Sequence, residues 1–516
     1  MRVAVLVHNS VMNDARVIKE AVTLWQAGHQ VVIHGISATE RAVLNALPGT
    51  NIAVFLEPPI APLKKAAGSP LENAAGSPTS PQQVFGKNAL RFGLMWPLQL
   101  LELSLAVMLI WWSARQLHDR YASDLGGHAL LAITLLLGAL ASAAFGRFRR
   151  WQWKAISGWL RRRDSITAKN ASTSPQVSAP EVPSPPGSRY RRLSQALLTS
   201  LERHPAPDII HLHDHVALTL ARELKARYNA PLTWDAHEIY EELAGADTER
   251  ARDNAAIIAA NQGYVDHFIT INTSIARFYQ EHYPDLPAAR IVMNATIPGP
   301  VPQDDGRLHA AAALPRTQKI LLFQGGFGPH RGLHQLVEAA PRLPPEWTLV
   351  MMGWGNLERE LRELASKQPR AGECPAAVFL PGVPQQELQQ WTAGATLGVI
   401  PYENTSLNHL YSTPNKLWEY PSAGVPVLAS DLVEMAAMLK PHPYGFLLPR
   451  EFTSADIVSA VTGLTAQMLA DARANAARFL EANNWSVWEQ NLLAVYREIG
   501  ERLATRAQQT PATDSV

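Results

Sequence analysis

Short apolar runs alternate with longer amphipathic segments at the start of the chain. Residues 3–7 are typical of a buried strand, residues 14–27 place their apolar side chains on one side of a helix, and residues 30–34 predict the next strand. Gly28 is expected to end the helix, because glycine is favoured just beyond a helix C-terminus. This strand–helix–strand order predicts a parallel, doubly wound sheet, which residues 52–56 extend.

The alternation resumes after about residue 190 and continues toward the end of the chain. Further strands of the first sheet are expected at residues 208–213, 232–237, 267–272 and 290–294, with a helix at about 215–227. A proline-rich linker at residues 298–317 precedes a second series of strands, at residues 319–323, 347–352, 377–380, 396–401 and 426–430, and helices at about 455–479 and 486–505. The pattern therefore predicts an α/β protein with two Rossmann-like domains.

The pattern breaks between residues 57 and 189. Two linkers rich in proline and small residues enclose two apolar runs, of which residues 92–112 are long enough to span a bilayer and residues 129–145 are marginal. Arginines interleaved with tryptophans follow, which favours a membrane hairpin with both ends cytoplasmic. Buried core helices, or helices lying in the interface, are the alternatives. Glu102 argues against a membrane span, because a lipid-facing carboxylate costs several kcal/mol.

These patterns divide the chain into segments. We expect an N-terminal Rossmann-like domain at 1–56 and 190–297, an insertion at 57–189, a C-terminal Rossmann-like domain at 318–480, a final helix at 481–505 and a flexible tail at 506–516. The 46 Lys and Arg residues nearly cancel the 45 Asp and Glu residues, so net charge does not suggest nucleic-acid binding. A single cysteine, Cys374, excludes an internal disulfide and fits a reducing compartment.

Glycines mark two loops of the second domain but are absent from the first turn of the chain. Residues 8–16 contain no glycine, so a dinucleotide-binding fingerprint is absent and a dehydrogenase is disfavoured. Residues 323–333 combine a strand, a glycine-rich turn and Arg331, whose planar guanidinium suits phosphate oxygens. Residues 353–356 repeat the arrangement after the next strand. Both loops are expected at the carboxyl edge of one sheet, where such sheets bind ligands.

Residues 411–430 predict a loop, a short helix and a buried strand. Lys416 and Glu419 are three positions apart and share one face of that helix. Ser412 and Thr413 are suitable cap residues, Pro414 suits a first turn, and helix N-termini attract anions. The segment therefore favours a phosphorylated, hydroxyl-rich ligand, whereas an ordinary α/β unit with a surface ion pair is the alternative.

Histidines and carboxylates cluster at two strand ends of the first domain. Strand alternation places His211 and His213 on one face and Asp214 on the other, so the spacing does not complete a metal-ligand set and no metal is predicted. His237 follows another strand and can orient a sugar or stabilise a charged transition state. A polar loop before the next helix, with Glu238 near its start, explains it equally well.

Taken together, the two domains, the glycine loops and a final helix with Trp485 and Tyr496 resemble a GT-B glycosyltransferase, and most closely the retaining glycosyltransferase family 4. The resemblance covers residues 1–56 and about 190–505. Glu419 matches the second of two glutamates that the family carries eight positions apart, which contacts the nucleotide ribose, while Tyr411 replaces the first. Arg331 matches the phosphate-binding Lys or Arg, and Gly325 replaces the other usual basic residue.

The resemblance implies a set of site residues. The catalytic residues would be His237, Arg331, Lys416 and Glu419; the donor-binding residues Gly325, Gly326, Gly353, Tyr411, Ser412, Thr413, Pro414 and Asn415; and the acceptor-side residues Asn13, Asp14 and Arg16. No metal and no cofactor are implied, and the co-substrate would be a UDP- or GDP-sugar.

The resemblance implies sugar transfer with retained anomeric configuration. Because the insertion lies in the first domain, we expect a lipid-linked or glycan acceptor at the cytoplasmic face of the inner membrane, in polysaccharide or glycolipid assembly. Two alternatives remain open at this point. One is a GT-B nucleotide-sugar epimerase, which would be expected to require more carboxylates around the donor. The other is a non-catalytic membrane scaffold that keeps the fold.

Overall fold

The computed structural model describes residues 1–12, 14–37, 42–44, 47–58, 188–368 and 375–509. These residues belong to one compact unit, Met1–Lys64 with Pro183–Val516. The second unit, Lys65–Val182, lies outside the described residues, as do the apolar runs expected at 92–112 and 129–145. None of the helices in the described ranges is both long enough and apolar enough to cross a membrane.

The first sheet has eight strands in the order β3-β4-β2-β1-β5-β6-β7-β8. Their bounds are β1 Arg2–Leu6, β2 Gln30–Ile36, β3 Ala42–Leu44, β4 Ala53–Glu57, β5 Ile209–His213, β6 Leu232–Ala236, β7 His267–Thr270 and β8 Ala289–Ile291. All neighbours are parallel except β3 and β4, which pair antiparallel. The short edge strand β3 was not predicted, because three residues carry no recognisable periodicity.

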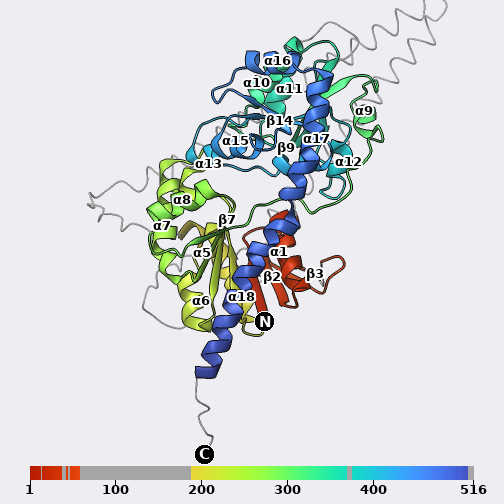
Figure 1. The fold of residues 1–516 in the computed structure, drawn as a ribbon. Coiled ribbons are helices and arrows are strands. Elements are labelled where there is room, and N and C mark those ends of the chain that lie inside the picture. Colours follow the sequence, from red (N-terminus) through yellow and green to blue (C-terminus); the bar gives the residue numbers. More distant parts are fainter. Residues whose placement is uncertain (13, 38–41, 45–46, 59–187, 369–374, 510–516) are drawn as a thin grey trace, which may run out of the picture. The chain divides into compact units, whose positions relative to one another are not determined.

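Helices cover this sheet on both sides (Figure 1). They are α1 Ala15–Gln26, α4 Arg191–Glu202, α5 Asp214–Leu218, α6 Ala221–Tyr228, α7 Thr248–Asn261 and α8 Thr273–His282, with short 3-10 turns at Ser188–Tyr190, Tyr240–Glu242 and Gln262–Tyr264. The single helix expected at 215–227 is wrong, because the chain breaks between α5 and α6. There the Thr219 hydroxyl donates to the Val216 carbonyl at 2.6 Å.

The second sheet has six parallel strands in the order β11-β10-β9-β12-β13-β14. The strands are β9 Lys319–Gly326, β10 Trp347–Trp354, β11 Ala377–Pro381, β12 Leu397–Ile400, β13 Val427–Ser430 and β14 Gly445–Leu448. The helices are α9 Arg307–Ala311, α10 Leu333–Ala339, α11 Glu358–Ser366, α12 Leu388–Thr392, α13 Leu407–Leu410, α14 Lys416–Ser422, α15 Val433–Leu439, α16 Ser454–Thr462, α17 Ala466–Ala482 and α18 Trp485–Gln509, with a 3-10 turn at Ala340–Arg342.

Three expectations for the C-terminal half need correction. The linker expected at 298–317 contains α9, and the helix expected at 455–479 is two helices, because Thr465 starts α17 by accepting a hydrogen bond from the Met468 amide. The flexible tail expected at residues 506–516 is wrong at its start, since α18 continues to Gln509, and residues 510–516 lie outside the described residues.

Both sheets are buried on their two faces. In β1, Val3 and Val5 pack into one hydrophobic cluster while Ala4 and Leu6 pack into another. A parallel sheet covered on both sides favours strands that are apolar at most positions, which is why its strands read as near-continuous apolar runs. Several polar residues, among them His8, Asp214 and His237, follow the carboxyl ends of these strands.

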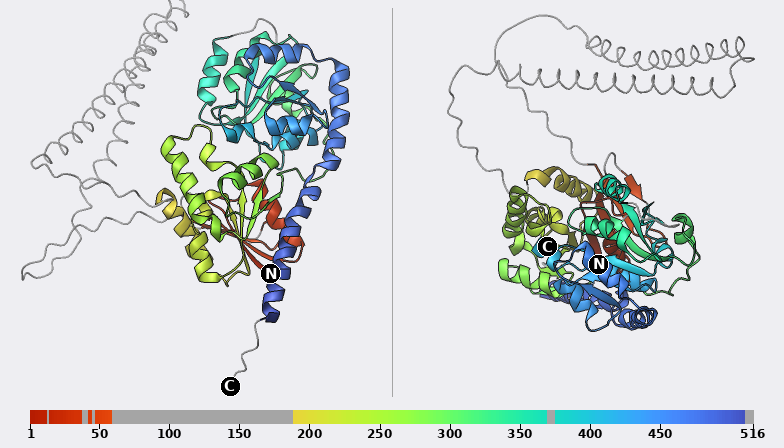
Figure 2. Two further views of the ribbon diagram at one scale, coloured as in Figure 1. Left: turned by 60° about the vertical axis from the view of Figure 1, so that its left-hand side comes forward. Right: turned by 90° about the horizontal axis from the view of Figure 1, so that it is seen from above.

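The last helix, α18, returns to the first sheet. Leu492, Val495 and Tyr496 are fully or almost fully buried in the same cluster as Val3 and Val5 of β1. This long blue helix (Figures 1 and 2) packs against α1 and β8. The helix therefore completes the core that the first strands cannot close on their own.

Candidate functional site

A cavity of about 680 Å³ is lined by residues that follow strands of both sheets. The first sheet contributes His8 after β1, Asp214 after β5 and His237 after β6, and the second contributes Gly325 in β9 and Trp354 at the end of β10. Since the carboxyl ends of parallel strands meet at one edge of each sheet, the ligand-suited side chains of the two sheets converge here.

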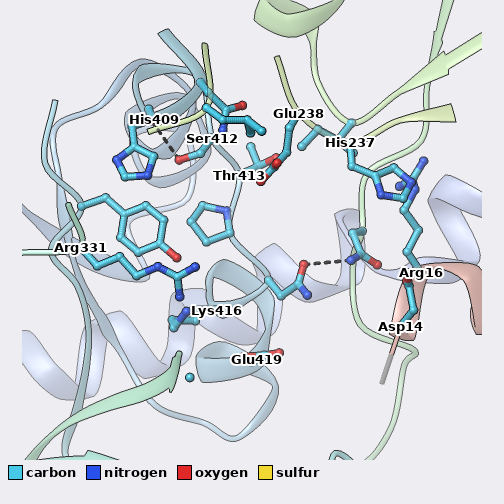
Figure 3. A pocket seen from close by; sticks show the side chains of 18 of the residues that line it. Asp14, Arg16, His237, Glu238, Arg331, His409, Ser412, Thr413, Lys416 and Glu419 are labelled. Atoms are coloured by element: carbon cyan, nitrogen blue, oxygen red, sulfur yellow. Dashed lines mark hydrogen bonds between the residues drawn. The ribbon is translucent and has the colours of Figure 1, made fainter. Parts of the chain in front are cut away.

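Two cations lie on the side of the cavity that the second sheet forms (Figure 3). Arg331 donates to the Gly326 carbonyl at 3.0 Å, and the Nζ atom of Lys416 lies 3.2 Å from where a Cβ on Gly325 would stand. Neither cation makes an ion pair with a carboxylate within the described part of the chain. Glycine at position 325, with φ of +117°, thus leaves open space beside two uncompensated positive charges.

The positive charge of these two cations affects the pKa of the Tyr402 hydroxyl. Burial alone would raise its pKa, but the nearby Lys416 and Arg331 lower it below its ordinary value. The ring of Tyr402 lies 5.7 Å from the Lys416 Nζ atom and 5.6 Å from the Arg331 guanidinium carbon. This wall of the cavity is therefore strongly electropositive and suits an anionic group such as a diphosphate.

The Glu419 carboxylate lines the same cavity and is oriented by two other side chains. Its Oε2 atom accepts a hydrogen bond from the Gln324 amide at 2.9 Å, and the Gln324 oxygen accepts one from the Thr392 hydroxyl at 2.7 Å. Lys416 and Glu419 face the cavity as expected, but they form no ion pair, so the surface-pair alternative is wrong. Lys416 is only 8% exposed.

The start of α14 differs from the expectation. The helix begins at Lys416 after Asn415, and no side chain caps it. The Ser412 hydroxyl donates instead to the His409 carbonyl at 2.9 Å, and Thr413 accepts from the Asn272 amide at 3.4 Å. The cap expectation is wrong because Ser412 bonds within the preceding turn, α13, and Thr413 bonds to Asn272 of the first domain.

The other expected donor-side residues divide into two groups. Ser412, Thr413, Pro414 and Asn415 line the cavity together with Gly325, whereas Gly326, Gly353 and Tyr411 are not part of its lining. A Cβ on Gly353 would stand 1.9 Å from the Gly325 carbonyl oxygen, so glycine there allows β9 and β10 to approach. The Tyr411 carbonyl accepts from the Asn272 amide at 2.7 Å, which links the loop to the first sheet.

His237 lies across the cavity between two carboxylates. Its Nε2 atom is 3.0 Å from Asp235 and its Nδ1 atom is 3.3 Å from Asp214. Burial alone would lower the pKa of His237, but Asp214 and Asp235 raise it to about 9. Tyr240 also donates to Asp214, at 2.5 Å. His237 is therefore an imidazolium at neutral pH.

The three expected acceptor-side residues lie in different environments. Asn13 is outside the described residues. Asp14 accepts from the Asn9 amide at 2.8 Å and caps α1 by accepting from the Val17 amide at 3.1 Å. Arg16 borders the cavity but is only 2% exposed and is paired with Asp235 and Glu20, at 2.7 and 3.0 Å. Its charge is thus compensated inside the protein.

A buried group behind His237 has the donor types of a metal site. One ligand atom from each of Glu20, His211, His213 and Asp235 lies within 4.8 Å of the others. The Arg16 guanidinium, however, donates to both Asp235 oxygens and pairs with Glu20, and it already supplies the positive charge that these carboxylates require. A divalent cation beside a guanidinium would meet strong repulsion, so the group does not fit a metal well.

Several cavity residues escaped the sequence reasoning. Gln324 and Tyr402 lie within or just after strands, where a polar residue gives no periodic signal. Trp354 is 63% exposed, and a Cβ on Gly382 would stand 2.3 Å from its ring. The sequence signal that could have predicted Trp354 as a cavity residue is a tryptophan between two glycines, at positions 353 and 355. Arg250, in the first turn of α7, also lines the cavity.

Comparison with known proteins supplies the family context. Residues 318–467 match the family model described as "Glycosyl transferases group 1", and residues 158–296 match "Glycosyltransferase Family 4". The two matches together cover more than half of the chain. A D-inositol 3-phosphate glycosyltransferase from Acidothermus cellulolyticus is 24% identical over 329 residues, which are 59% of this chain and 70% of that protein.

Two solved structures share the fold. Sucrose-phosphate synthase from Thermosynechococcus elongatus is similar with a TM-score of 0.57 and 12% identity, over 97% of this chain and 100% of that chain. The Anabaena protein HepE, in complex with UDP and glucose, is similar with a TM-score of 0.56 and 12% identity, over 96% of this chain and 100% of that chain. At these identities the likeness shows the fold alone, which is that of two facing α/β domains.

Proposed function

Because the chain belongs to the glycosyltransferases of group 1 and family 4, we propose that it moves a sugar from a UDP- or GDP-sugar to an acceptor hydroxyl with retention of configuration. The observation that carries this proposal is the convergence of Arg331 and Lys416 on Gly325 and Gly326 at the end of β9, without a carboxylate partner among the described residues. Their two charges match those of a diphosphate that leaves from the donor sugar.

The acceptor would bind on the opposite wall, near Asp14 and His237. The sugar–diphosphate bond breaks as the acceptor oxygen forms its bond to the same face of the same carbon. The diphosphate leaves with the electron pair, and its departing oxygen takes up the proton of the acceptor hydroxyl. Arg331 and Lys416 stabilise the charge that develops there, while Glu419, held by Gln324, is placed to bind ribose hydroxyls. Approach of the two domains would exclude water and suppress hydrolysis of the donor.

Separate observations support two acceptor classes. The apolar runs in the insertion support a lipid-linked acceptor at the cytoplasmic face of the inner membrane, in polysaccharide or glycolipid assembly. The similarity to D-inositol 3-phosphate glycosyltransferases supports a small phosphorylated polyol instead. Both classes require the same donor site.

The test is a panel of UDP-, GDP- and ADP-sugars scored by thermal stabilisation, followed by transfer assays with the sugar that binds. A ligand at a hundred times its dissociation constant stabilises by roughly 2.7 kcal/mol, which is readily measured. Lys416→Met should abolish the effect, whereas Lys440→Met, at an exposed lysine beside Asp431, should retain it. Stabilisation by no nucleotide sugar, an inverted product, or epimerised donor formed without acceptor would each overturn the proposal.

A further inference from the structure

Arg250 is an arginine of the first domain that lines the cavity without a carboxylate partner. It lies in the first turn of α7, where its backbone amide donates to Asp247 at 2.7 Å, so the main chain is fixed while the guanidinium remains available. No ion pair to Arg250 occurs within the described ranges. By contrast, Arg203 pairs with Glu57, and Arg227 pairs with Glu202 and Glu223.

Two other cations on this wall are compensated by carboxylates. Arg16 is paired with Asp235 and Glu20, and His237 lies between Asp214 and Asp235. His215, which is 5% exposed, stays neutral, because burial lowers its pKa to about 4 and Asp214 opposes that shift only in part. Arg250 is among the charges that lower the pKa of His215, and both residues line the cavity.

A chain of contacts connects His237 to His215 on this wall of the cavity. The Tyr240 hydroxyl accepts from the His237 amide at 3.0 Å, and the Tyr240 ring packs on the His215 ring with centroids 4.4 Å apart. Arg250 lines the same cavity as Tyr240, His215 and His237. The cavity therefore brings an uncompensated guanidinium together with His237, which suits a charged substituent on an acceptor whose hydroxyl reacts beside His237.

We propose that Arg250 binds a phosphate group on the acceptor and selects phosphorylated acceptors over neutral ones. This inference rests on the proposed glycosyl transfer. A guanidinium offers a planar pair of N–H donors that matches phosphate oxygens, and an uncompensated one in a cavity wall favours such an anion strongly. A soluble polyol phosphate and a phosphate-linked lipid share this chemistry, so both would use the same residue.

The experiment compares the full-length protein with Arg250→Gln and with Arg252→Gln as the matched control. Arg252 is exposed on the same helix and is not part of the cavity lining. Each protein is first titrated with UDP and GDP, which tests the proposed function separately. With the better-binding nucleotide saturating the donor side, it is then titrated with myo-inositol, myo-inositol phosphate, and detergent-dispersed polyprenyl phosphate.

We expect at least one of the two phosphorylated probes to bind the wild type more tightly than myo-inositol. Which of them binds distinguishes the soluble source from the lipid source. Arg250→Gln should weaken that binding roughly ten- to hundredfold, while Arg252→Gln should not change it. Equal affinity for neutral and phosphorylated probes, or unchanged phosphate binding in Arg250→Gln, would overturn the inference even if UDP or GDP binds normally. Failure of both nucleotides to bind would count against the proposed function instead.

Discussion

The Arg16 guanidinium donates two hydrogen bonds to the Asp235 carboxylate, at 2.7 and 2.8 Å, although the residues are 219 positions apart. A third bond, of 2.6 Å, reaches the Val292 carbonyl. Burial alone would raise the pKa of Asp235, but Arg16 and His237 hold it well below its ordinary value. Arg16 therefore keeps Asp235 ionised beside His237 and acts as a positioning residue.

Removal of one partner of this buried pair should destabilise the protein strongly. Arg16→Met leaves the Asp235 charge buried without its main partner, and we expect a loss of about 3–5 kcal/mol in the free energy of unfolding. Arg2→Met is the control, because Arg2 pairs with Asp208 on the surface and such pairs contribute about 1 kcal/mol or less. Urea unfolding measures both, and equal losses would contradict the account.

The raised pKa of His237 predicts a pH dependence. Because the folded-state pKa of about 9 exceeds the ordinary value of 6.5, the stabilisation from the imidazolium is complete below about pH 6.5 and is lost as the pH rises through about 9. If the imidazolium also serves transfer, kcat/KM should fall over the same range. The histidine Cε1–H resonance and a pH–rate profile measure these two effects.

Asp214→Asn provides the matching perturbation. It removes one carboxylate beside His237, so the titration and the fall in kcat/KM should both move to lower pH. Asp471→Asn, at an exposed aspartate on α17, should move neither. A wild-type titration near pH 6.5, or an unchanged profile in Asp214→Asn, would show that the two carboxylates do not hold His237 in its charged form.

The Gln324 amide should matter for donor binding through Glu419. Gln324→Met removes the hydrogen bond that orients the Glu419 carboxylate, and we expect KM for the nucleotide sugar to rise roughly tenfold. Gln318→Met is the control, because the Gln318 amide bonds Pro345 and Thr348 just before the other end of β9. It should lower stability without changing KM, and an equal KM in the two variants would exclude the orienting role.

The fold was largely predictable because burial on both faces makes parallel strands read as apolar runs. Twelve expected strands coincide with observed ones to within a few residues, whereas the short strands β3 and β14 were missed. The shared face of Lys416 and Glu419 follows from local helix geometry, and the structure places both in the cavity lining.

The internal pairing of the site could not be predicted. Periodicity reports which side of an element is buried, but the contacts of Arg16 with Asp235 and of Gln324 with Glu419 join residues far apart in the chain. Arg16 was therefore expected to face an acceptor, and Gln324 was not among the predicted site residues. The predicted caps of α14 were wrong for a related reason, because Ser412 and Thr413 form hydrogen bonds with residues that only the folded chain brings near them.

Nucleotide titration of the wild type, Arg331→Ala and Lys416→Met tests the central claim most directly. The claim is that these two cations bind the donor diphosphate, so each variant should bind UDP or GDP roughly ten- to hundredfold more weakly, while binding of uridine or guanosine stays unchanged. Diphosphate affinity equal to that of the wild type, or an equal loss for the nucleosides, would contradict it.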